Sequence, residues 1–490
     1  MKRYLLLFAI CVMALVPGEL DAKSVGTFEF VSPMPGAKYV TSETTIIIRP
    51  RVDSPLLGLD RALSFTVTGS VSGNHTGEII LSDDGKTVIF EPHTPFISGE
   101  RVSVKIATDD TMTRTVRMVP LSFDFEISSQ RAVHPRDFDE YAECFLDAAA
   151  DDSADKTLNG RPGLSSRNAV PQGPYPLPPD FPQLNVSINE NPEGGDIFTV
   201  NFRRRSKAEA RYLMILDNTG FPKYFKKMPK NLNGADFKVQ SNGLLTYHQR
   251  VTNIYLAMDN TYTVIDSFAC GNGYSTDGHE LQIIDNGHAL VMSYDRQTVD
   301  MSEIVEGGNP EATVVGLIIQ ELDTSKNVVF QWRSWDHFKI TDVIGADLTD
   351  DRIDYVHGNA IEQDLDGNIL ISCRHMSEIT KIDRATGDII WRMGGKNNQF
   401  TFLNDPDHPL GTSYQHDCRI LKNGNLTVFD NGNLHEPQHS RGVEYKLDEA
   451  NLTATRVWEF RDTPDACAVF VGNARRVPNG STMVSWGGTW

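Results

Sequence analysis

The sequence predicts an all-β protein, with an N-terminal β-sandwich followed by a six-bladed β-propeller. Two observations lead to this prediction. Short runs of alternating apolar and polar residues, each bounded by turn residues, fill residues 25–128, which is typical of a sandwich. From residue 195 onward the chain repeats an Asn-Gly or Asp-Gly turn followed by an apolar strand, which is typical of propeller blades.

Composition and charge restrict the function classes. The chain has 490 residues, of which 40% are hydrophobic, so it has enough apolar material for several packed cores. Its 65 acidic residues outnumber 46 basic ones and give a formal net charge of −19. This charge argues against nucleic acid and anionic membranes as partners, because phosphate binding needs a basic face. An anionic substrate would need a locally positive site.

The first 22 residues predict a signal peptide. Lys2 and Arg3 precede an apolar run from Tyr4 to Val16, and residues 20–22 supply a plausible cleavage site. The apolar run is too short to cross a bilayer of about 30 Å, and no later stretch of the sequence is long enough for a membrane helix. We therefore expect an exported protein, secreted or periplasmic.

Residues 25–128 contain the expected sandwich strands. The stretch from Asp84 to Pro92, followed by Ser98-Gly99-Glu100, resembles bacterial immunoglobulin-like domains. Such a domain usually spaces or docks its neighbour, and the sequence places no reactive cluster in it. Residues 129–194 predict a short helix, with Phe138, Tyr141 and Phe145 on one face, and then a proline-rich linker.

Residues 195–490 predict the propeller. The turn glycines Gly243, Gly287, Gly367, Gly424 and Gly480 are separated by 44, 80, 57 and 56 residues. Intervals of this length fit about four short strands per unit, and the pattern predicts six blades. The longest interval predicts two inserted rim loops, at residues 296–315 and 336–355. The last unit stops at Trp490 without its second half, so either residues 195–202 complete it or the chain is truncated, and we favour truncation.

Polar residues at one phase of the repeat predict a site. Counting back eight residues from the turn glycine reaches His279, Asn359 and His416, and His357 lies two residues before Asn359 on the same strand face. Equal phase in successive blades means an equal position around the propeller axis. We therefore expect these residues to meet at one mouth of the central channel.

Several motifs in this region resemble those of the bacterial arylsulfotransferase (aryl-sulfate sulfotransferase) family. They are His357-Gly358-Asn359-Ala360, Ile371-Ser372-Cys373-Arg374-His375, Lys381-Ile382-Asp383, Trp391-Arg392-Met393-Gly394-Gly395, Tyr414-Gln415-His416-Asp417 and Phe429-Asp430-Asn431-Gly432-Asn433. The resemblance implies a six-bladed propeller that moves a sulfuryl group from a phenolic sulfate to another phenol. It implies a transiently sulfated histidine, and no nucleotide sulfate donor, cofactor or metal.

The resemblance also implies roles for five residues. His416 matches the nucleophile, and His279, His357, Asn359 and Arg374 match the groups around the sulfate. These residue types suit the chemistry, because neutral imidazole is a nucleophile at neutral pH and a guanidinium fork binds non-bridging oxygens. Asn359 can donate a hydrogen bond, and either His279 or His357 could protonate the departing phenolate. The sequence leaves open which of the two does so.

Other histidines carry weaker signals. Strand alternation places His375 on the face opposite Arg374, which favours packing over catalysis. His435 and His439 lie in a proline-containing loop and could be rim residues or ligand contacts.

Two other functions compete with sulfuryl transfer. Residues 385–391 are similar to the docking repeats of quinone-dependent dehydrogenase propellers, although one blade alone shows the pattern well. A non-catalytic secreted binding propeller is the other alternative. Hydrolysis in place of transfer, the natural donor and acceptor, and the oligomeric state stay open.

Overall fold

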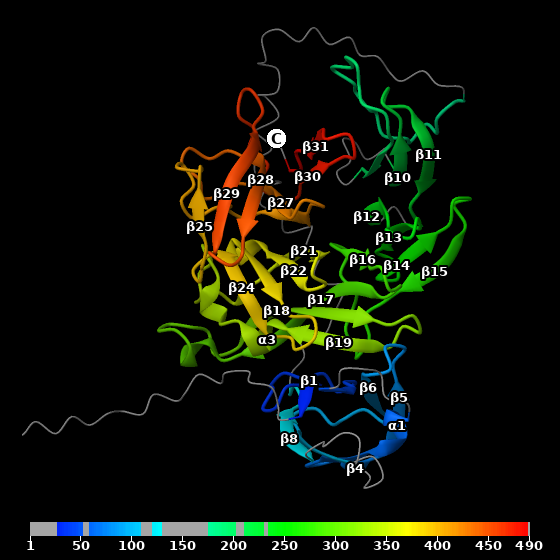
Figure 1. Ribbon diagram of the computed structural model, residues 1–490, viewed down its shortest axis with the longest axis vertical. Helices are drawn as coiled ribbons and strands as arrows, with labels where there is room; N and C mark the ends of the chain where they lie inside the picture. Colours follow the sequence, from blue (N-terminus) through cyan, green and yellow to red (C-terminus); the bar gives the residue numbers. More distant parts are fainter. Residues whose placement is uncertain are drawn as a thin grey trace, which may run out of the picture.

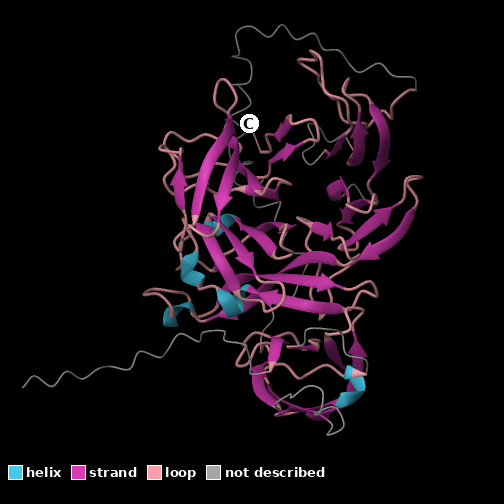
Figure 2. Ribbon diagram, viewed as in Figure 1, coloured by secondary structure: helices cyan, strands magenta, loops and turns pink. Residues whose placement is uncertain are grey.

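The computed structural model describes residues 27–51, 58–108, 120–129, 175–201, 210–229 and 234–488. The predicted signal peptide and the short helix around Tyr141 lie outside these residues. Within them the protein is nearly all β, with antiparallel sheets and a few one-turn helices such as α1 (Leu59–Ala62) and α3 (Ser334–His337) (Figure 2). No helix in these ranges has the length and hydrophobicity needed to cross a bilayer.

Two four-stranded antiparallel sheets form the N-terminal part. The first has the order β1-β2-β6-β5 and comprises β1 (Phe28–Ser32), β2 (Ile46–Pro50), β5 (Gly77–Leu81) and β6 (Val88–Pro92). The second has the order β4-β3-β7-β8 and comprises β3 (Leu63–Gly69), β4 (Gly73–His75), β7 (Arg101–Thr108) and β8 (Leu121–Glu126). Alternate residues of both sheets, among them Val31, Ile46, Val67 and Val104, enclose one hydrophobic core.

Six sheets follow one another along the C-terminal part. The first three consist of β9 (Ile197–Val200), β10 (Tyr212–Leu216) and β11 (Pro222–Lys227); of β12 (Gly234–Val239), β13 (Leu245–Gln249), β14 (Ile254–Met258) and β15 (Val264–Phe268); and of β16 (Leu281–Ile283), β17 (Ala289–Val299), β18 (Ala312–Leu322) and β19 (Val328–Arg333), with β20 (Arg352–Asp354) paired to β18. Apart from β20, consecutive strands pair with each other in these three sheets, so most contacts that build them are local in sequence.

The last three sheets continue the pattern. They consist of β21 (Gly358–Gln363), β22 (Ile369–Cys373), β23 (Glu378–Ile382) and β24 (Ile389–Gly394); of β25 (Thr401–Leu403), β26 (His416–Ile420), β27 (Asn425–Asp430), β28 (Arg441–Asp448) and β29 (Thr453–Phe460); and of β30 (Asn473–Arg476) and β31 (Thr482–Ser485). Figure 1 shows the sheets arranged around a common centre, with the last near the first.

The predicted turns are confirmed. The glycines at 243, 287, 367, 424 and 480 lie in the turns β12–β13, β16–β17, β21–β22, β26–β27 and β30–β31, with φ between +81° and +93°. This left-handed conformation is one that a glycine adopts without steric cost.

Two details of the sequence prediction are decided by strand pairing. The loop predicted at residues 296–315 is shorter than expected and spans residues 300–311, because β17 and β18 pair from Ala289 with Leu322 to Val299 with Ala312. The segment at Ile197–Val200 pairs with β10, so it belongs to the first sheet and does not complete the last one.

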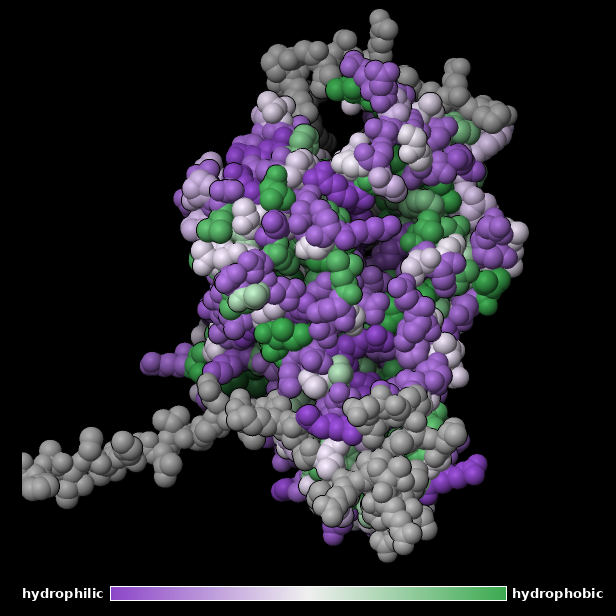
Figure 3. All heavy atoms as spheres, in the orientation of Figure 1, coloured by the Kyte–Doolittle hydropathy of each residue, from purple (hydrophilic) through white to green (hydrophobic). Residues whose placement is uncertain are grey.

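The N-terminal part packs against the third and fourth of these sheets. Phe30 stacks on Phe330 with ring centroids 4.9 Å apart, and Arg49 donates hydrogen bonds to the backbone carbonyls of Arg384 and Ala385. The two parts therefore share apolar and polar contacts (Figure 1). The face seen in Figure 3 is mostly hydrophilic, in keeping with the acidic composition.

Candidate active site

A cavity of about 460 Å³ lies where the six sheets meet. The innermost strand of each sheet, or the segment next to it, contributes to its lining. The residues are Val200 next to β10 in the first sheet, Ala235 and Asp236 in β12, His279 and Glu280 before β16, Asn359 in β21, His416, Asp417 and Arg419 in β26, and Gly472, Asn473 and Arg475 at β30. Phe470, Val471 and Trp486 add apolar wall.

The phase of the repeat predicts which residues line this cavity. Ala235, His279, Asn359, His416 and Gly472 each lie eight residues before a turn glycine, and all five line the cavity. The structure therefore brings together the three polar residues that the phase singles out. Ala235 and Gly472 occupy the same position in their sheets, but their side chains carry no chemistry that a sequence search could detect.

His416 begins β26 and is buried. Its Nδ1 lies 2.7 Å from Asn431 Oδ1, and its Nε2 accepts a hydrogen bond from the Val471 backbone N–H at 3.2 Å. An amide oxygen can only accept, so Nδ1 carries the proton and Nε2 keeps its lone pair. Burial and the nearby charge of Arg374 hold the pKa of His416 well below its usual value. The ring is therefore neutral, with its lone pair on Nε2.

Asn431 holds this tautomer in place, and sequence reasoning did not single it out. Its Nδ2 donates to the carbonyl oxygens of Ala468 at 2.5 Å and Val471 at 2.9 Å. With both amide hydrogens used on carbonyls, Oδ1 must face His416. Asn431 follows the last residue of β27, but its motif alone gave no indication that it contacts the ring.

His279 and His357 are each paired with a largely buried carboxylate. His279 Nδ1 lies 2.6 Å from Asp277 Oδ1, and His357 Nδ1 lies 2.8 Å from Asp354 Oδ2. The two imidazole centroids are 5.4 Å apart. Burial raises the pKa of Asp277, but the charge and hydrogen bonds of His279 outweigh it and lower the pKa to about 2. Each carboxylate therefore orients its ring, but burial outweighs Asp354 and lowers the pKa of His357.

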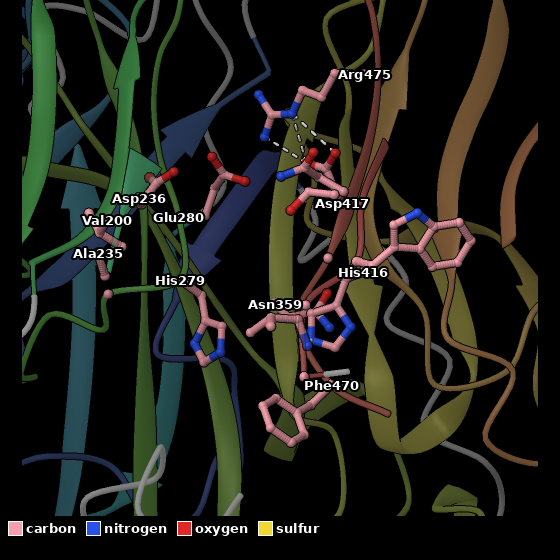
Figure 4. A pocket seen from close by; sticks show the side chains of 18 of the residues that line it. Val200, Ala235, Asp236, His279, Glu280, Asn359, His416, Asp417, Phe470 and Arg475 are labelled. Atoms are coloured by element: carbon pink, nitrogen blue, oxygen red, sulfur yellow. Dashed lines mark hydrogen bonds and ion pairs between the residues drawn. The ribbon is translucent and has the colours of Figure 1, made fainter. Parts of the chain in front are cut away.

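The five predicted residues do not all face the cavity. His279, Asn359 and His416 line it, whereas His357 and Arg374 lie behind the lining. Figure 4 shows His279 on one wall and Asn359 with His416 on the other. Asn359 donates from Nδ2 to the Gln415 carbonyl at 2.8 Å, and its buried Oδ1 has no hydrogen-bond partner. One Asn359 N–H is thus already used, and its orphan oxygen is an acceptor.

Arg374 is held by protein groups. It donates to the Val469 carbonyl at 3.0 Å and to His375 Nε2 at 2.7 Å, and its guanidinium lies 4.7 Å from the centroid of Tyr414. Residues 374–376 form a 3₁₀ turn and do not continue β22. Strand alternation therefore fails here, and the His375 ring lies 4.5 Å from that of His357, on the same side as the other site histidines.

Potential metal ligands also lie in this region. Asp354, His357 and His375 have ligand atoms within 4.8 Å of one another. However, His375 Nδ1 bonds to the Asp354 carbonyl, His375 Nε2 accepts from Arg374, and His357 Nδ1 bonds to the Asp354 carboxylate. These contacts make the group a hydrogen-bonded support for the histidines.

A charged layer borders the cavity beyond the histidines (Figure 4). Asp417 accepts from Arg475 Nη2 at 2.6 Å and from Arg419 Nε at 2.8 Å, and Arg419 also bonds to Glu280 at 2.5 Å. Lys238 contacts Glu280 and lies 2.9 Å from Asp236. These side chains come from different sheets and neutralise one another across the centre.

Comparisons with known proteins agree with this geometry. The family model described as Arylsulfotransferase (ASST) matches residues 185–489. A segment of 57 residues is 44% identical to the arylsulfate sulfotransferase AssT of Escherichia coli O6:H1, and this match covers 10% of this chain and 10% of that protein.

Similar solved structures share little with this chain. A protein of unknown function from Bacteroides caccae is 14% identical, with a TM-score of 0.35, and the match covers 56% of this chain and 78% of that one. Virginiamycin B lyase from Staphylococcus aureus is 9% identical, with a TM-score of 0.30, and the match covers 56% and 77%. Likenesses this weak carry no argument about function.

Proposed function

The chain belongs to the arylsulfotransferase family, and on that basis we propose that it transfers a sulfuryl group from an aryl sulfate ester to a phenolic acceptor without a nucleotide donor. The observation that carries this proposal is the meeting of His279, Asn359 and His416 on one cavity, with the lone pair of His416 Nε2 fixed by Asn431. The quinone-dependent and binding-protein alternatives find no support in the comparisons.

The proposal includes the architecture and location. Six successive sheets that each send an inner strand or adjoining segment to one cavity support a six-bladed propeller over residues 195–490. Two sheets around one core support an immunoglobulin-like sandwich over residues 25–128, with residues 129–194 as the connection. We also propose export through residues 1–22. Detection of the uncleaved N-terminus on protein from the culture medium or periplasm would contradict export by cleavage.

The first step forms a sulfo-histidine. His416 Nε2 attacks sulfur, the N–S bond forms, and the bond from sulfur to the aryl oxygen breaks with its electrons leaving on the phenolate. Sulfuryl transfer passes through a loose transition state like that of phosphoryl transfer, so positioning and electrostatics supply most of the catalysis. The neutral state of His416 means that no proton has to leave Nε2 before the attack; only the hydrogen bond from the Val471 N–H to that lone pair must break.

Neighbouring side chains stabilise the negative charge on the sulfate oxygens and on the leaving phenolate. We assign protonation of the leaving phenolate to His279, because it lines the cavity and Asp277 supports its protonated form. Arg374 supplies positive charge from behind the wall and favours binding of the sulfate oxygens, whereas burial lowers the pKa of His357 and keeps its ring neutral. In the second step a phenol attacks sulfur, the N–S bond breaks, and His279 takes the phenol proton. The cycle then returns to its starting state.

The decisive experiment is intact-mass analysis after brief mixing with 4-nitrophenyl sulfate. We expect an added SO₃ on the wild type, located on His416 by peptide mapping, and transfer to added phenol. His416→Ala should lose the adduct and the release of nitrophenol. His93→Ala is the matched control, because His93 is an exposed histidine of the N-terminal part. Full activity in His416→Ala would reject the mechanism.

A further inference from the structure

Three histidines that the transfer reaction does not use lie together beside the site. His408 is in the loop between β25 and β26, and His435 and His439 are in the loop between β27 and β28. Their ring centroids are 4.1 Å apart for His408 and His435, 5.1 Å for His408 and His439, and 5.5 Å for His435 and His439. Two loops, separate in sequence, thus place three imidazoles side by side.

In two of these rings, one nitrogen is hydrogen-bonded to a protein oxygen. His439 Nδ1 lies 2.8 Å from the Pro437 carbonyl oxygen, and His435 Nε2 lies 2.8 Å from Asp430 Oδ2. Burial raises the pKa of Asp430, but the hydrogen bond from His435 and the charge of Arg441 lower it to about 2, so its carboxylate is an acceptor. The protons therefore sit on the hydrogen-bonded nitrogens. His439 Nε2 and His435 Nδ1 therefore keep their lone pairs. Histidines that bind metals usually show this arrangement, with the other ring N–H donated to a carboxylate or a backbone carbonyl.

Two nitrogens of this cluster also lack a hydrogen-bond partner. The His408 and His439 side chains belong to residues that are 5% and 4% exposed, and neither His408 Nδ1 nor His439 Nε2 has a hydrogen-bond partner. A buried polar atom without a partner carries a desolvation penalty that a bound ligand would remove. Two buried imidazole nitrogens without partners in one cluster therefore indicate a ligand-binding site.

We propose that His408, His435 and His439 form a binding site for a divalent transition-metal ion of borderline softness, with Zn²⁺ as the prototype. Imidazole nitrogen suits this class of ion, and the spacing of His435 and His439, with three residues between them, matches histidine pairs of zinc sites.

Binding requires a small rearrangement. The ring nitrogens are not yet within 4.8 Å of one another, so at least one ring turns about its side-chain torsions when the ion enters. His435 is partly exposed and provides the entry side. The ion would join the loop that leads into His416 to the loop that starts at Asn431, so it would brace both residues without touching the reacting atoms.

The test uses tag-free full-length protein stripped with a chelator. We titrate Zn²⁺ calorimetrically and Co²⁺ by its visible absorption, and we record the melting temperature with and without Zn²⁺. The wild type should bind one equivalent at this cluster, develop cobalt d–d bands and melt at a higher temperature. His435→Ala is the primary variant, because His435 is the member of the cluster that is not fully buried, and its melting temperature without Zn²⁺ reports the cost of losing the bond to Asp430. It should weaken binding at least tenfold and lose the shift in melting temperature.

Two further variants separate this site from others. His439→Ala should reproduce the effect of His435→Ala, whereas the exposed histidine variant His93→Ala should bind as the wild type does. His375→Gln removes a ligand from the other histidine group, at Asp354 and His357. The inference is overturned if the wild type binds no equivalent, or if His435→Ala keeps its affinity while His375→Gln loses it. Neither outcome depends on sulfotransferase activity.

Discussion

The position of one proton decides what His416 can do. With hydrogen on Nδ1, Nε2 keeps its lone pair, which accepts a hydrogen bond from the Val471 N–H at 3.2 Å. Asn431 enforces this arrangement because its own amide hydrogens are committed to two carbonyls. On the proposed mechanism, Asn431 is thus a positioning residue that acts through His416.

Substitution of Asn431 tests this role. Asn431→Ala should lower kcat/KM for an aryl sulfate about ten- to a hundredfold, the effect of losing one buried hydrogen bond. Asn431→Asp should restore the acceptor but add a negative charge beside Nδ1–H, which raises the pKa of His416. More of the enzyme is then protonated at a given acidic pH, so the acid limb of the rate profile should move to higher pH.

A neighbouring asparagine provides the control. Asn433 donates to the Val469 carbonyl at 3.0 Å in the same loop, yet no contact with His416 is among its hydrogen bonds. Asn433→Ala should leave the pH profile in place. Equal shifts in the profiles of Asn431→Asp and Asn433→Ala would show that the loop as a whole, and not the single acceptor, sets the protonation of His416.

The predictability of these residues follows from their place in the repeat. His279, Asn359 and His416 share one phase, so their convergence could be predicted from spacing alone. Asp277, Asp354 and Asn431 lie outside that phase, and their contacts depend on how loops fold back on the strands. The 3₁₀ turn at residues 374–376 reverses the expected direction of His375 in the same way.

At the scale of elements, turn chemistry determined what could be predicted. The Asn-Gly and Asp-Gly turns fix the first hairpin of five sheets, because their glycines adopt positive φ. The length of β17 and β18 could not be predicted, because these strands are extended where they reach the N-terminal part. There Gln297 accepts a hydrogen bond from Ser128 at 2.5 Å.

The junction between the N-terminal sheets and the third and fourth C-terminal sheets depends on Arg49 of β2. Its guanidinium donates hydrogen bonds to the carbonyls of Arg384 and Ala385, and loss of these bonds leaves part-buried acceptors unpaired. We expect Arg49→Ala to cost about 1–3 kcal/mol in a urea unfolding measurement and to speed proteolysis at the junction. Arg101→Ala should change stability by less than about 1 kcal/mol, because its partner Asp124 forms an exposed surface pair. Equal losses in the two variants would contradict this role for Arg49.

At the scale of the whole molecule, the cavity is bordered by charges from different sheets. A second position of the repeat, five residues before the turn glycine, carries charged residues in four sheets: Lys238, Glu362, Arg419 and Arg475. Arg419 lies 3.2 Å from Glu362 and 2.8 Å from Asp417, so it joins adjacent sheets through charge. The repeat thus predicts the layers of the centre, whereas the number of strands in the last sheet depends on pairing that no local signal encodes.

Arg475 holds the last sheet, which has two strands, to the sheet that contains Asp417. Its guanidinium grips Asp417 through Nε and Nη2, and Asp417 also accepts from the Ala474 backbone N–H at 3.2 Å. Since β30 follows the segment that carries Phe470 and Val471, loosening it would also loosen the cavity wall. We expect Arg475→Met to increase hydrogen exchange of β30 and β31 amides at least tenfold, with smaller changes in β26 because Asp417 keeps Arg419.

Arg461→Met is the matched control for loss of the Arg475–Asp417 ion pair. Arg461 pairs with Asp465 four residues away, so its loss removes a local pair and leaves the sheets joined as before. Its exchange in β30 and β31 should equal that of the wild type. High salt should reproduce part of the Arg475→Met effect, because Arg475 is 40% exposed and its attraction to Asp417 is open to screening. Unchanged exchange in Arg475→Met would mean that apolar packing of Ala474 and Val484 against Phe429 and Trp486, and not charge, holds the last sheet in place.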